Sequence, residues 1–429
     1  MALLPLKQSD KKSEGMEMKL VNMRLSAAAK SLSSVLILTA LISFLILGGG
    51  KVFGQAIDIA KAPLLTLKTA PGLLMLTMGR DLPLYKAAYN DVNDLDGDGQ
   101  IDLYFKPRFR YEGYFAYDRC YDFDSAASLF KPIRIGDKQT PDVNDQSKDY
   151  YKCLGGAAGQ WSGNFLNWVS MSRMDVLRKV LYGGKRSTDG TSTVLERAYI
   201  PQDSTLWGKE YTSTLVDGYD ITEFTPLNLP TGVTKHMFAN TTLVTGSTRF
   251  SATVNPPKMI VYQNRPGRIW DLVAQERLIL GTNPGVTPPP SATEGTVITQ
   301  YTVRIETCKL LSSKYEDWCT GYPAGSATPA AYKPTGLLHR YGEAKSLAFG
   351  LISGTYDNNY SGGVLRQNID NFGREVNSAN GQYTSVTGIV HHLNAFRAWG
   401  FAGGDWACGS FTSLPNNGAC PAWGNPVGL

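Results

Sequence analysis

A short acidic loop, DLDGDGQID at residues 94–102, constrains the fold more than any other stretch of this chain. Three carboxylates at alternate positions are followed by a glycine and then by a fourth carboxylate: Asp94, Asp96, Asp98, Gly99 and Asp102. Like charges this close repel one another, so the loop is stable mainly when a cation neutralises it. The spacing reproduces positions 1, 3, 5, 6 and 9 of calcium-binding loops, and it predicts a metal site.

Ca²⁺ is the cation that these residues favour, because several carboxylates and a carbonyl suit a larger and less strictly octahedral ion than Mg²⁺. The predicted ligands are Asp94, Asp96, Asp98, Asp102 and, through its backbone carbonyl, Gln100. Ile101 is expected to pin the loop to a hydrophobic core. Phe105 stands where an EF-hand carries a bidentate glutamate, so a further ligand has to come from elsewhere or from water. The alternative is an acidic glycine turn that binds no metal.

The first 56 residues have the pattern of a secretory signal peptide. Basic residues precede an apolar run at residues 35–47, which is shorter than the roughly 20 residues that span a bilayer. Gly54 and Ala56 are the small residues that a signal peptidase requires, and we predict cleavage after Ala56. The alternative is an uncleaved signal anchor.

Six cysteines fit an exported protein. They fall into neighbouring pairs along the sequence: Cys120 with Cys153, Cys308 with Cys319, and Cys408 with Cys420. None of these pairs has the CxxC spacing of a zinc or thioredoxin site. In an oxidising compartment we expect three local disulfides, although sequence leaves their connectivity open.

Charge and motifs argue against nucleic-acid binding and against catalysis. The 42 basic and 37 acidic residues give a net charge of +5 without a basic block. The four histidines, which are His236, His339, His391 and His392, lack HExxH spacing. The chain has neither a GxSxG elbow nor a phosphate-binding loop. We therefore expect a protein that is not an enzyme.

Hydrophobic periodicity predicts an α/β protein. Apolar runs at residues 73–78 and 347–352 are expected to form buried strands, and residues 163–182 and 388–399 are expected to form helices. Ser162 is a plausible N-cap of the first helix. Residues from about 187 to 333 are rich in threonine, proline and glycine, and we expect this insertion to form its own β-rich layer.

Several blocks of the sequence resemble the N-terminal region of the PilC/PilY1 family. These blocks include YEGYFAYDRCYDF, WSGNFLNWVSMSRMDVLRKVLYGGKR, TVLERAYIPQDSTLWGKEYTS, RIWDLV and YKPTGLLHRYGEAKSLAFGLISGTY. Members of that family are tip-associated adhesins and assembly factors of type IV pili in Gram-negative bacteria. The resemblance covers nearly all of the chain after residue 56.

The resemblance implies a von Willebrand factor A-like domain over residues 57–429, with the β-rich insertion inside it. In many relatives the first strand ends in DxSxS, which helps to bind a divalent ion. Here Gly79 and Asp81 follow the strand without a serine in register, so that metal-ion-dependent adhesion site is expected to be degenerate. Relatives also carry a C-terminal β-propeller, whereas this sequence stops at Leu429, which suggests a fragment or a truncated product.

The function expected from the resemblance is a calcium-binding adhesion module and pilus biogenesis factor. Its expected partners are minor pilins and the pilus tip, with a host or abiotic surface as a further partner. We expect neither nucleic acid nor a soluble small-molecule substrate. The expected location is the cell surface, pilus tip or outer membrane of a Gram-negative bacterium. The alternative is a secreted, calcium-stabilised carbohydrate-binding protein or hydrolase.

Overall fold

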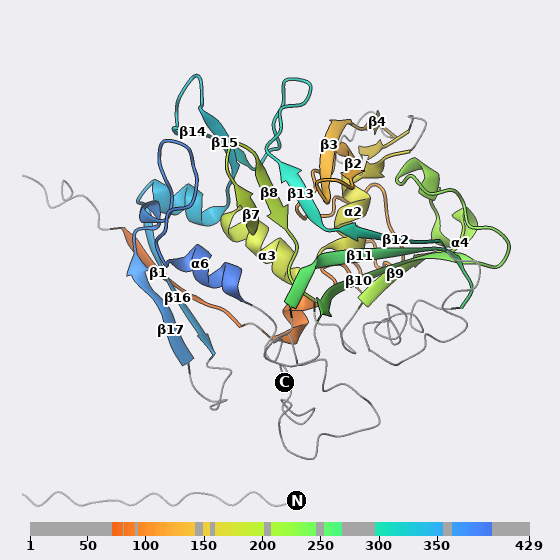
Figure 1. Cartoon of the computed structure of the whole chain (residues 1–429), viewed down its shortest axis with the longest axis horizontal. Helices are drawn as coiled ribbons and strands as arrows, with labels where there is room; N and C mark the ends of the chain where they lie inside the picture. Colours follow the sequence, from red (N-terminus) through yellow and green to blue (C-terminus); the bar gives the residue numbers. More distant parts are fainter. Residues whose placement is uncertain are drawn as a thin grey trace, which may run out of the picture. The chain divides into compact units, whose positions relative to one another are not determined.

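The computed structural model describes nine ranges of the chain, which Figure 1 draws in colour: residues 71–79, 81–90, 93–141, 149–154, 159–200, 207–245, 253–267, 297–354 and 363–396. The predicted signal peptide at residues 1–56, the RIWDLV block and the predicted Cys408–Cys420 pair lie outside these ranges. Among the described helices, none combines the length and the apolar character needed to cross a bilayer.

The largest sheet has six strands in the order β6-β2-β3-β13-β8-β7. Their bounds are Trp161–Ser162 for β6, Arg119–Asp124 for β2, Leu129–Ile135 for β3, Arg304–Thr307 for β13, Thr193–Glu196 for β8 and Arg186–Asp189 for β7. Neighbouring strands are antiparallel except at the centre, where β13 runs parallel to β3.

A second sheet has four antiparallel strands in the order β12-β11-β10-β9. Their bounds are Val297–Thr302 for β12, Thr253–Arg265 for β11, Lys235–Thr245 for β10 and Trp207–Tyr211 for β9. A single buried residue, Val303, separates β12 from β13 and carries the chain from this sheet into the six-stranded one. Its N–H donates to the Pro257 carbonyl at 2.9 Å, and its own carbonyl accepts from the Arg197 N–H at 3.1 Å.

The residues expected to form a separate β-rich layer are therefore divided between two sheets. Strands β9 to β12 build the four-stranded sheet, but β8 and β13 pair into the sheet that also contains β2, β3 and β6. Those three strands precede the predicted insertion along the chain. All four residues of β8 are buried, so both faces of this strand have to be covered. A position inside the six-stranded sheet, between β13 and β7, meets this requirement.

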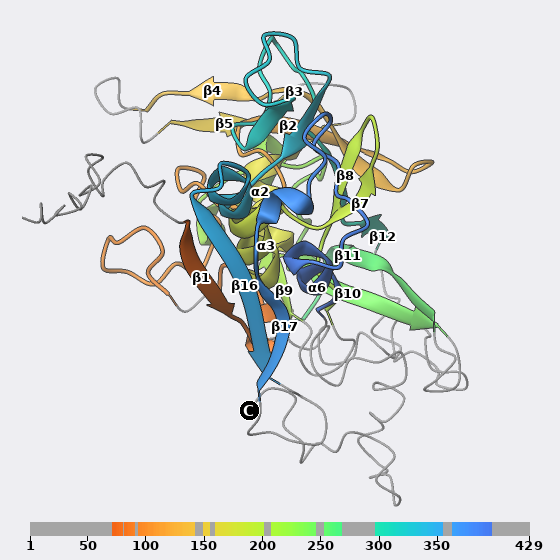
Figure 2. The same cartoon turned by 90° about the vertical axis from the view of Figure 1, so that its left-hand side faces the viewer.

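A third sheet has three strands in the order β1-β16-β17. Strand β1 (Gly72–Thr77) runs parallel to β16 (Leu347–Gly354), and β17 (Gly363–Asp370) runs antiparallel to β16. Figure 2 shows the three strands side by side. The strands predicted at 73–78 and 347–352 are both present, and they pair with each other. The expectation that both are buried holds for β16 but is wrong for β1, where Leu73, Leu74 and Met75 are exposed because β1 lies at the edge of this sheet.

Two helices occupy the residues where one was predicted. Helix α2 covers Gly163–Ser170 with Ser162 as its N-cap, and α3 covers Arg173–Tyr182. Met171 between them is extended, and Ser172 begins α3 with a capping box that it forms with Asp175. The capping box starts α3, because it satisfies free N–H groups in the first turn of the new helix. The apolar stripe therefore continues through the break between α2 and α3.

Shorter elements complete the described fold. Helix α6 covers Ile389–Ala395, α4 covers Thr214–Asp217, and η2, η4, η6 and η7 cover Leu82–Tyr85, Ile221–Glu223, His339–Glu343 and Phe372–Arg374. The two hairpins pair β4 (Asp137–Gln139) with β5 (Tyr150–Lys152), and β14 (Cys319–Tyr322) with β15 (Ala331–Pro334). The predicted helix at 388–399 corresponds to α6, and residues 397–399 lie outside the described ranges.

Two hydrophobic cores lie among these elements. The first joins α2 to the six-stranded and four-stranded sheets and is strongly aromatic, with members such as Phe105, Tyr111, Phe130, Phe165, Trp168 and Phe238. The second joins β16 to α3 and α6 through residues such as Met174, Phe349, Leu351, Ile389 and Leu393. Arg178 of α3, which is buried, donates to the carbonyls of Leu393 and Phe396 and so closes the C-terminal end of α6.

Candidate functional site

The acidic loop folds around its own backbone. The Asp94 carboxylate accepts hydrogen bonds from the N–H groups of Gly97, Asp98 and Gly99 at 2.7, 3.2 and 2.9 Å. Asp102 closes the loop, because its carboxylate accepts from the Leu95 N–H at 2.5 Å. Gly97 and Gly99 both have positive φ angles, which glycine adopts at little cost. The loop is thus turned so that its side-chain oxygens converge.

A lysine that the sequence analysis did not single out lies among the carboxylates. The Lys106 ammonium is 2.7 Å from Asp96 Oδ2 and 3.0 Å from Asp98 Oδ2, and it also forms an ion pair with Asp102. Burial opposes its charge, but the three carboxylates outweigh burial and raise the pKa of Lys106. The nearness of Lys106 to Asp102 along the chain, four residues away, was the signal that could have revealed this partner.

The loop carboxylates respond to the same contacts. The hydrogen bond from Lys106 is the main cause that lowers the pKa of Asp98, and the Gln100 N–H adds to it. At Asp102, burial raises the pKa, but the hydrogen bonds from Lys106 and from the Leu95 N–H outweigh it and lower the pKa overall. Both carboxyl groups are therefore held in the ionised form that binds a cation.

The arrangement fits a hard divalent cation through three of the predicted ligands. Oxygens of Asp94, Asp96 and Asp102 lie within 4.8 Å of one another. Asp98 is outside that group and instead accepts from the Gln100 N–H at 2.8 Å. Carboxylate oxygens are the ligands that Ca²⁺ prefers, and Ca²⁺ would compete with the Lys106 ammonium for the same oxygens.

Phe105, and not Ile101, anchors the loop to the core. Ile101 is 59 % exposed, so the expectation that it pins the loop is wrong. Phe105 is buried, and its ring lies 5.2–5.7 Å from five aromatic rings: those of Tyr111, Phe165, Trp168, Tyr219 and Phe224. Phe105, at the position where an EF-hand carries its glutamate, is therefore apolar because it packs into the first core.

Two buried asparagines of α2 hold the segment that follows the loop. The Asn164 side chain accepts from the Tyr111 N–H at 2.9 Å and donates to the Phe109 carbonyl at 2.8 Å. The Asn167 side chain accepts from the Phe115 N–H at 3.1 Å and donates to the carbonyls of Tyr111 and Phe115, both at 2.8 Å. These bonds satisfy buried backbone groups of a segment that belongs to no strand or helix.

Two of the three predicted disulfides are present in the described residues. Cys120 pairs with Cys153, and Cys308 pairs with Cys319. The second disulfide closes the loop from Cys308 to Cys319, and the buried Arg119 side chain contacts residues within this loop. Arg119 donates to the carbonyls of Lys309 and Lys314 at 2.8 and 2.9 Å and lies 3.1 Å from Glu316.

The histidines do not gather into a site. His236 and His339 are buried in different parts of the fold, and His391 and His392 lie on α6. Within the described ranges, two groups of potential metal ligands converge: the acidic loop, and Cys308 with Glu316 and Cys319. The two sulfurs of the latter group form a disulfide, so the acidic loop is the better candidate for a metal.

Comparison with known proteins identifies the family. A model described as "PilY1 homolog, small alpha/beta domain" matches residues 102–262, and one described as "PilY1 homolog, second domain" matches residues 349–428. A relative from Xylella fastidiosa, strain Temecula1, named "Type IV pilus biogenesis factor PilY1 homolog", is 38 % identical over 373 residues, which is 82 % of this chain. The chain is a PilY1-like protein.

A second relative from the same strain carries the same name and is 26 % identical over 318 residues, or 72 % of this chain. The PilY1-like chain spans 23 % and 22 % of the length of these two relatives. No solved structure matches the chain. The first family model begins at Asp102 and includes α2. The matched part therefore contains the last carboxylate of the acidic loop and also Asn164 and Asn167, which hold the segment after the loop.

Proposed function

We propose that this chain acts in the biogenesis of type IV pili. The observation that carries the proposal is the 38 % identity over 373 residues to a relative named as a pilus biogenesis factor. The match of two separate family models to two parts of the chain adds support, because a chance match would not recur in chain order.

Within that role the chain is a surface-exposed adhesion module at the pilus tip, without catalytic activity. Its partners are minor pilins and the surface to which the pilus attaches. The protein is exported and resides at the cell surface, pilus tip or outer membrane. Two disulfides support export, since disulfides persist in oxidising compartments outside the cytosol.

The acidic loop binds Ca²⁺ in this proposal. Asp94, Asp96 and Asp102 hold the ion, and Asp98 and the Gln100 carbonyl remain the other two ligands predicted from the sequence. When bound, Ca²⁺ supplies the charge that neutralises the carboxylates and orders the loop. Its binding energy adds to folding stability, because the unfolded chain offers no such site.

The three-stranded sheet belongs to a von Willebrand factor A-like domain with a degenerate adhesion site. Support comes from the parallel pairing of β1 with β16 and from α3 and α6, which share the second core with β16. Gly79 and Asp81 follow β1 without the serines of a metal-ion-dependent adhesion site, so the acidic loop is the cation site that we assign to this chain.

Deletion of the gene in its host tests the role. We expect fewer surface pili or weaker attachment, both restored by complementation, and immunogold label that clusters at the ends of sheared filaments. Asp96→Ala in the complementing gene tests the calcium component separately. Normal piliation and attachment in the deletion strain, with loss of a secreted hydrolytic or carbohydrate-binding activity, would favour the alternative function.

A further inference from the structure

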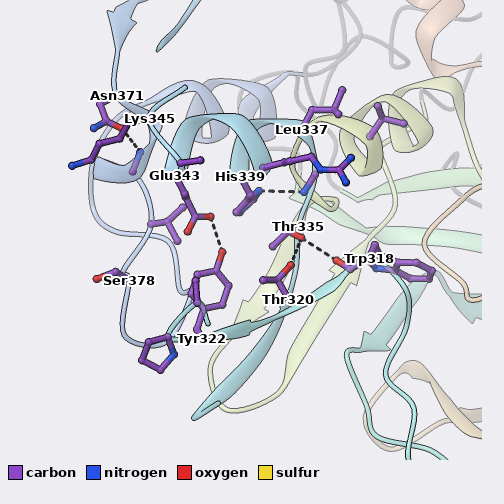
Figure 3. Close-up of a pocket in the computed structure, with 18 of the residues that line it drawn as sticks. Trp318, Thr320, Tyr322, Thr335, Leu337, His339, Glu343, Lys345, Asn371 and Ser378 are labelled. Carbon is purple, nitrogen blue, oxygen red and sulfur yellow. Dashed lines mark hydrogen bonds between the residues drawn. The ribbon is translucent and has the colours of Figure 1, made fainter. Parts of the chain in front are cut away.

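A groove far along the sequence from the acidic loop has the size and chemistry of a peptide-binding site. Its volume is about 1260 Å³, and it is lined by three segments of the chain together with the end of α3. The segments are β14 with the residues beside it, the stretch from Thr335 to Lys345 that contains η6, and residues 371–378. Figure 3 shows these residues around the opening.

One wall presents alternate side chains of a strand. Trp318, Thr320 and Tyr322 line the groove from β14 and the residue before it, as the two-residue period of a strand requires. The Lys179 ammonium lies 4.1 Å from the centre of the Trp318 ring, which holds the indole in place. A ligand meets the Trp318 ring and the exposed Thr320 on this wall, because Tyr322 is buried and its hydroxyl donates to Glu343 (Figure 3).

The carboxylates of the groove are already engaged. Glu112 pairs with Lys179, Asp317 is 3.4 Å from Arg110 and 3.1 Å from Lys314, and Glu343 accepts a 2.6 Å hydrogen bond from the Tyr322 hydroxyl. Each of these groups has a partner that satisfies it, so the groove offers few free acceptors of this kind to a ligand.

Two cations of the groove have no such partner. Arg340 and Lys345 are exposed, and neither makes an ion pair with any carboxylate that the structure describes. They lie on η6 and on the turn that follows it. The groove thus presents two exposed cations outside any ion pair together with the Trp318 ring.

A buried histidine also borders the groove. His339 lines the groove and is 4 % exposed. Its Nδ1 accepts from the Gly336 N–H at 3.3 Å, and burial lowers the pKa of the ring well below its usual value, so the neutral ring carries its proton on Nε2. Nε2 has no hydrogen-bond partner among the described residues. Because Nε2 is itself buried, we assign it no contact with a ligand.

We propose that this groove binds an extended acidic segment of a partner protein. Carboxylates of the segment pair with Arg340 and Lys345, and an apolar or aromatic side chain packs near Trp318. The complementary charge favours this occupant over a neutral oligosaccharide, which would leave both cations unpaired. The inference does not depend on the pilus role.

Binding of labelled peptides to the purified chain, with its disulfides formed, tests the proposal by fluorescence anisotropy. The probes are a short capped peptide of alternating serine and glutamate and its serine–glutamine counterpart. We expect saturable binding of the glutamate peptide only, weakened by salt. The double variant Arg340→Gln and Lys345→Gln should weaken binding about tenfold, since two partly exposed ion pairs are lost.

Matched controls use cations that are exposed and that line neither this groove nor the acidic loop. Arg173→Gln together with Lys86→Gln removes the same two charge types, and binding should change less than about twofold. Trp318→Ala should also weaken binding while the fold remains, as judged by circular dichroism. Equal loss in both double variants, tighter binding of the serine–glutamine peptide or of a neutral oligosaccharide, or no saturable binding at all would overturn the proposal.

Discussion

At the scale of single residues, Lys106 decides how the acidic loop behaves. Its ammonium contacts three of the four carboxylates that the sequence marks as cation ligands. One positive charge leaves the four carboxylates with a net negative charge, whereas Ca²⁺ brings twice that charge and binds several oxygens at once. The lysine stabilises the loop, and in the Ca²⁺ site that we propose it would compete with the ion for the same oxygens.

Replacement of this lysine by an apolar residue should separate the two effects. We expect Lys106→Met to bind Ca²⁺ about tenfold more tightly in calorimetry, because the competing ammonium is absent. Without Ca²⁺, the same variant should melt at a lower temperature than the unmodified chain, because its carboxylates then repel one another.

Asp96→Ala is the control for the ion itself, and it should lose most of the increase in melting temperature that Ca²⁺ produces in the unmodified chain. If Ca²⁺ neither binds nor raises the melting temperature of the unmodified chain and of Lys106→Met, the loop is an acidic turn held by a lysine alone.

Glu316 is a second residue with a distinct electrostatic role. It is buried beside Arg119 under the Cys308–Cys319 disulfide. Burial raises the pKa of Glu316 to about 7, against an attraction from Arg119 that lowers it. In the unfolded chain the carboxyl group titrates near 4.5. The folded protein therefore binds more protons than the unfolded chain between these two pH values.

This difference predicts a pH dependence with a defined sign. The contribution of Glu316 to the free energy of unfolding is largest below about pH 4.5, falls as the pH rises, and levels off above about pH 7, with a total change of up to about 3 kcal/mol. Urea unfolding at several pH values should show that Glu316→Gln gains stability relative to the unmodified chain across this range. A constant difference, or a gain no larger than in Glu306→Gln, would contradict the prediction.

At the scale of elements, α2 acts as a polar clamp as well as a core helix. All eight of its residues are buried, and two of them are asparagines. Asn164 and Asn167 provide hydrogen bonds to backbone between residues 107 and 115, where no strand or helix provides them. An apolar residue at either position would leave several buried backbone groups without partners.

Asn167→Ala should lower the free energy of unfolding by about 3 kcal/mol, because it leaves a buried N–H and two carbonyls unsatisfied and opens a small cavity. Chemical denaturation measures this loss. Asn368→Ala, on an exposed asparagine of β17, should change the free energy by less than about 0.5 kcal/mol. Similar losses in both variants would show that α2 does not clamp this segment.

The same elements show what sequence reasoning can reach. The apolar runs located β1 and β16, although β1 is mostly exposed, and the apolar stripe located α2 and α3, because burial on one face imposes a helical period on the sequence. The break at Met171 was missed because the stripe continues through it, while the capping box of Ser172 and Asp175 is a local polar signal. The two asparagines were missed because their partners lie more than 50 residues away and depend on tertiary contacts that no local pattern records. Lys106 lies only four residues after Asp102, and it was missed because the acidic loop was read without the residues that follow it.

The anchoring of the acidic loop illustrates the same limit. Sequence pattern chose Ile101 because isoleucine is apolar and lies within the loop, yet the fold buries Phe105 and exposes Ile101. The choice depends on where the first core lies, which the loop sequence alone cannot specify. Neighbouring cysteines, in contrast, were paired correctly at Cys120–Cys153 and Cys308–Cys319, since short loops close most readily.

At the scale of the whole molecule, the two disulfides should contribute unequally. Cys120–Cys153 closes a loop of 33 residues, and Cys308–Cys319 closes a loop of 11. In the chain-entropy description, the longer loop gives about 4 kcal/mol and the shorter about 3 kcal/mol. Urea unfolding of the two double-alanine variants should therefore show the larger loss for Cys120 and Cys153. The reverse order would mean that the contacts of Arg119 with Lys309, Lys314 and Glu316, and not chain entropy, determine how much the Cys308–Cys319 disulfide stabilises the fold.

The pairing of β1 with β16 also sets the point during synthesis at which the three-stranded sheet can fold. Leu74 lies opposite Phe349, so roughly 270 residues have to be synthesised and carried past the first strand before it finds its neighbour. Contacts between such distant residues form late and slow the search for the native state. Until then the apolar segment at residues 73–78 has no partner strand, and exposed apolar segments of this kind promote aggregation. A chain that folds during synthesis therefore needs a chaperone or rapid completion to avoid aggregation with other copies.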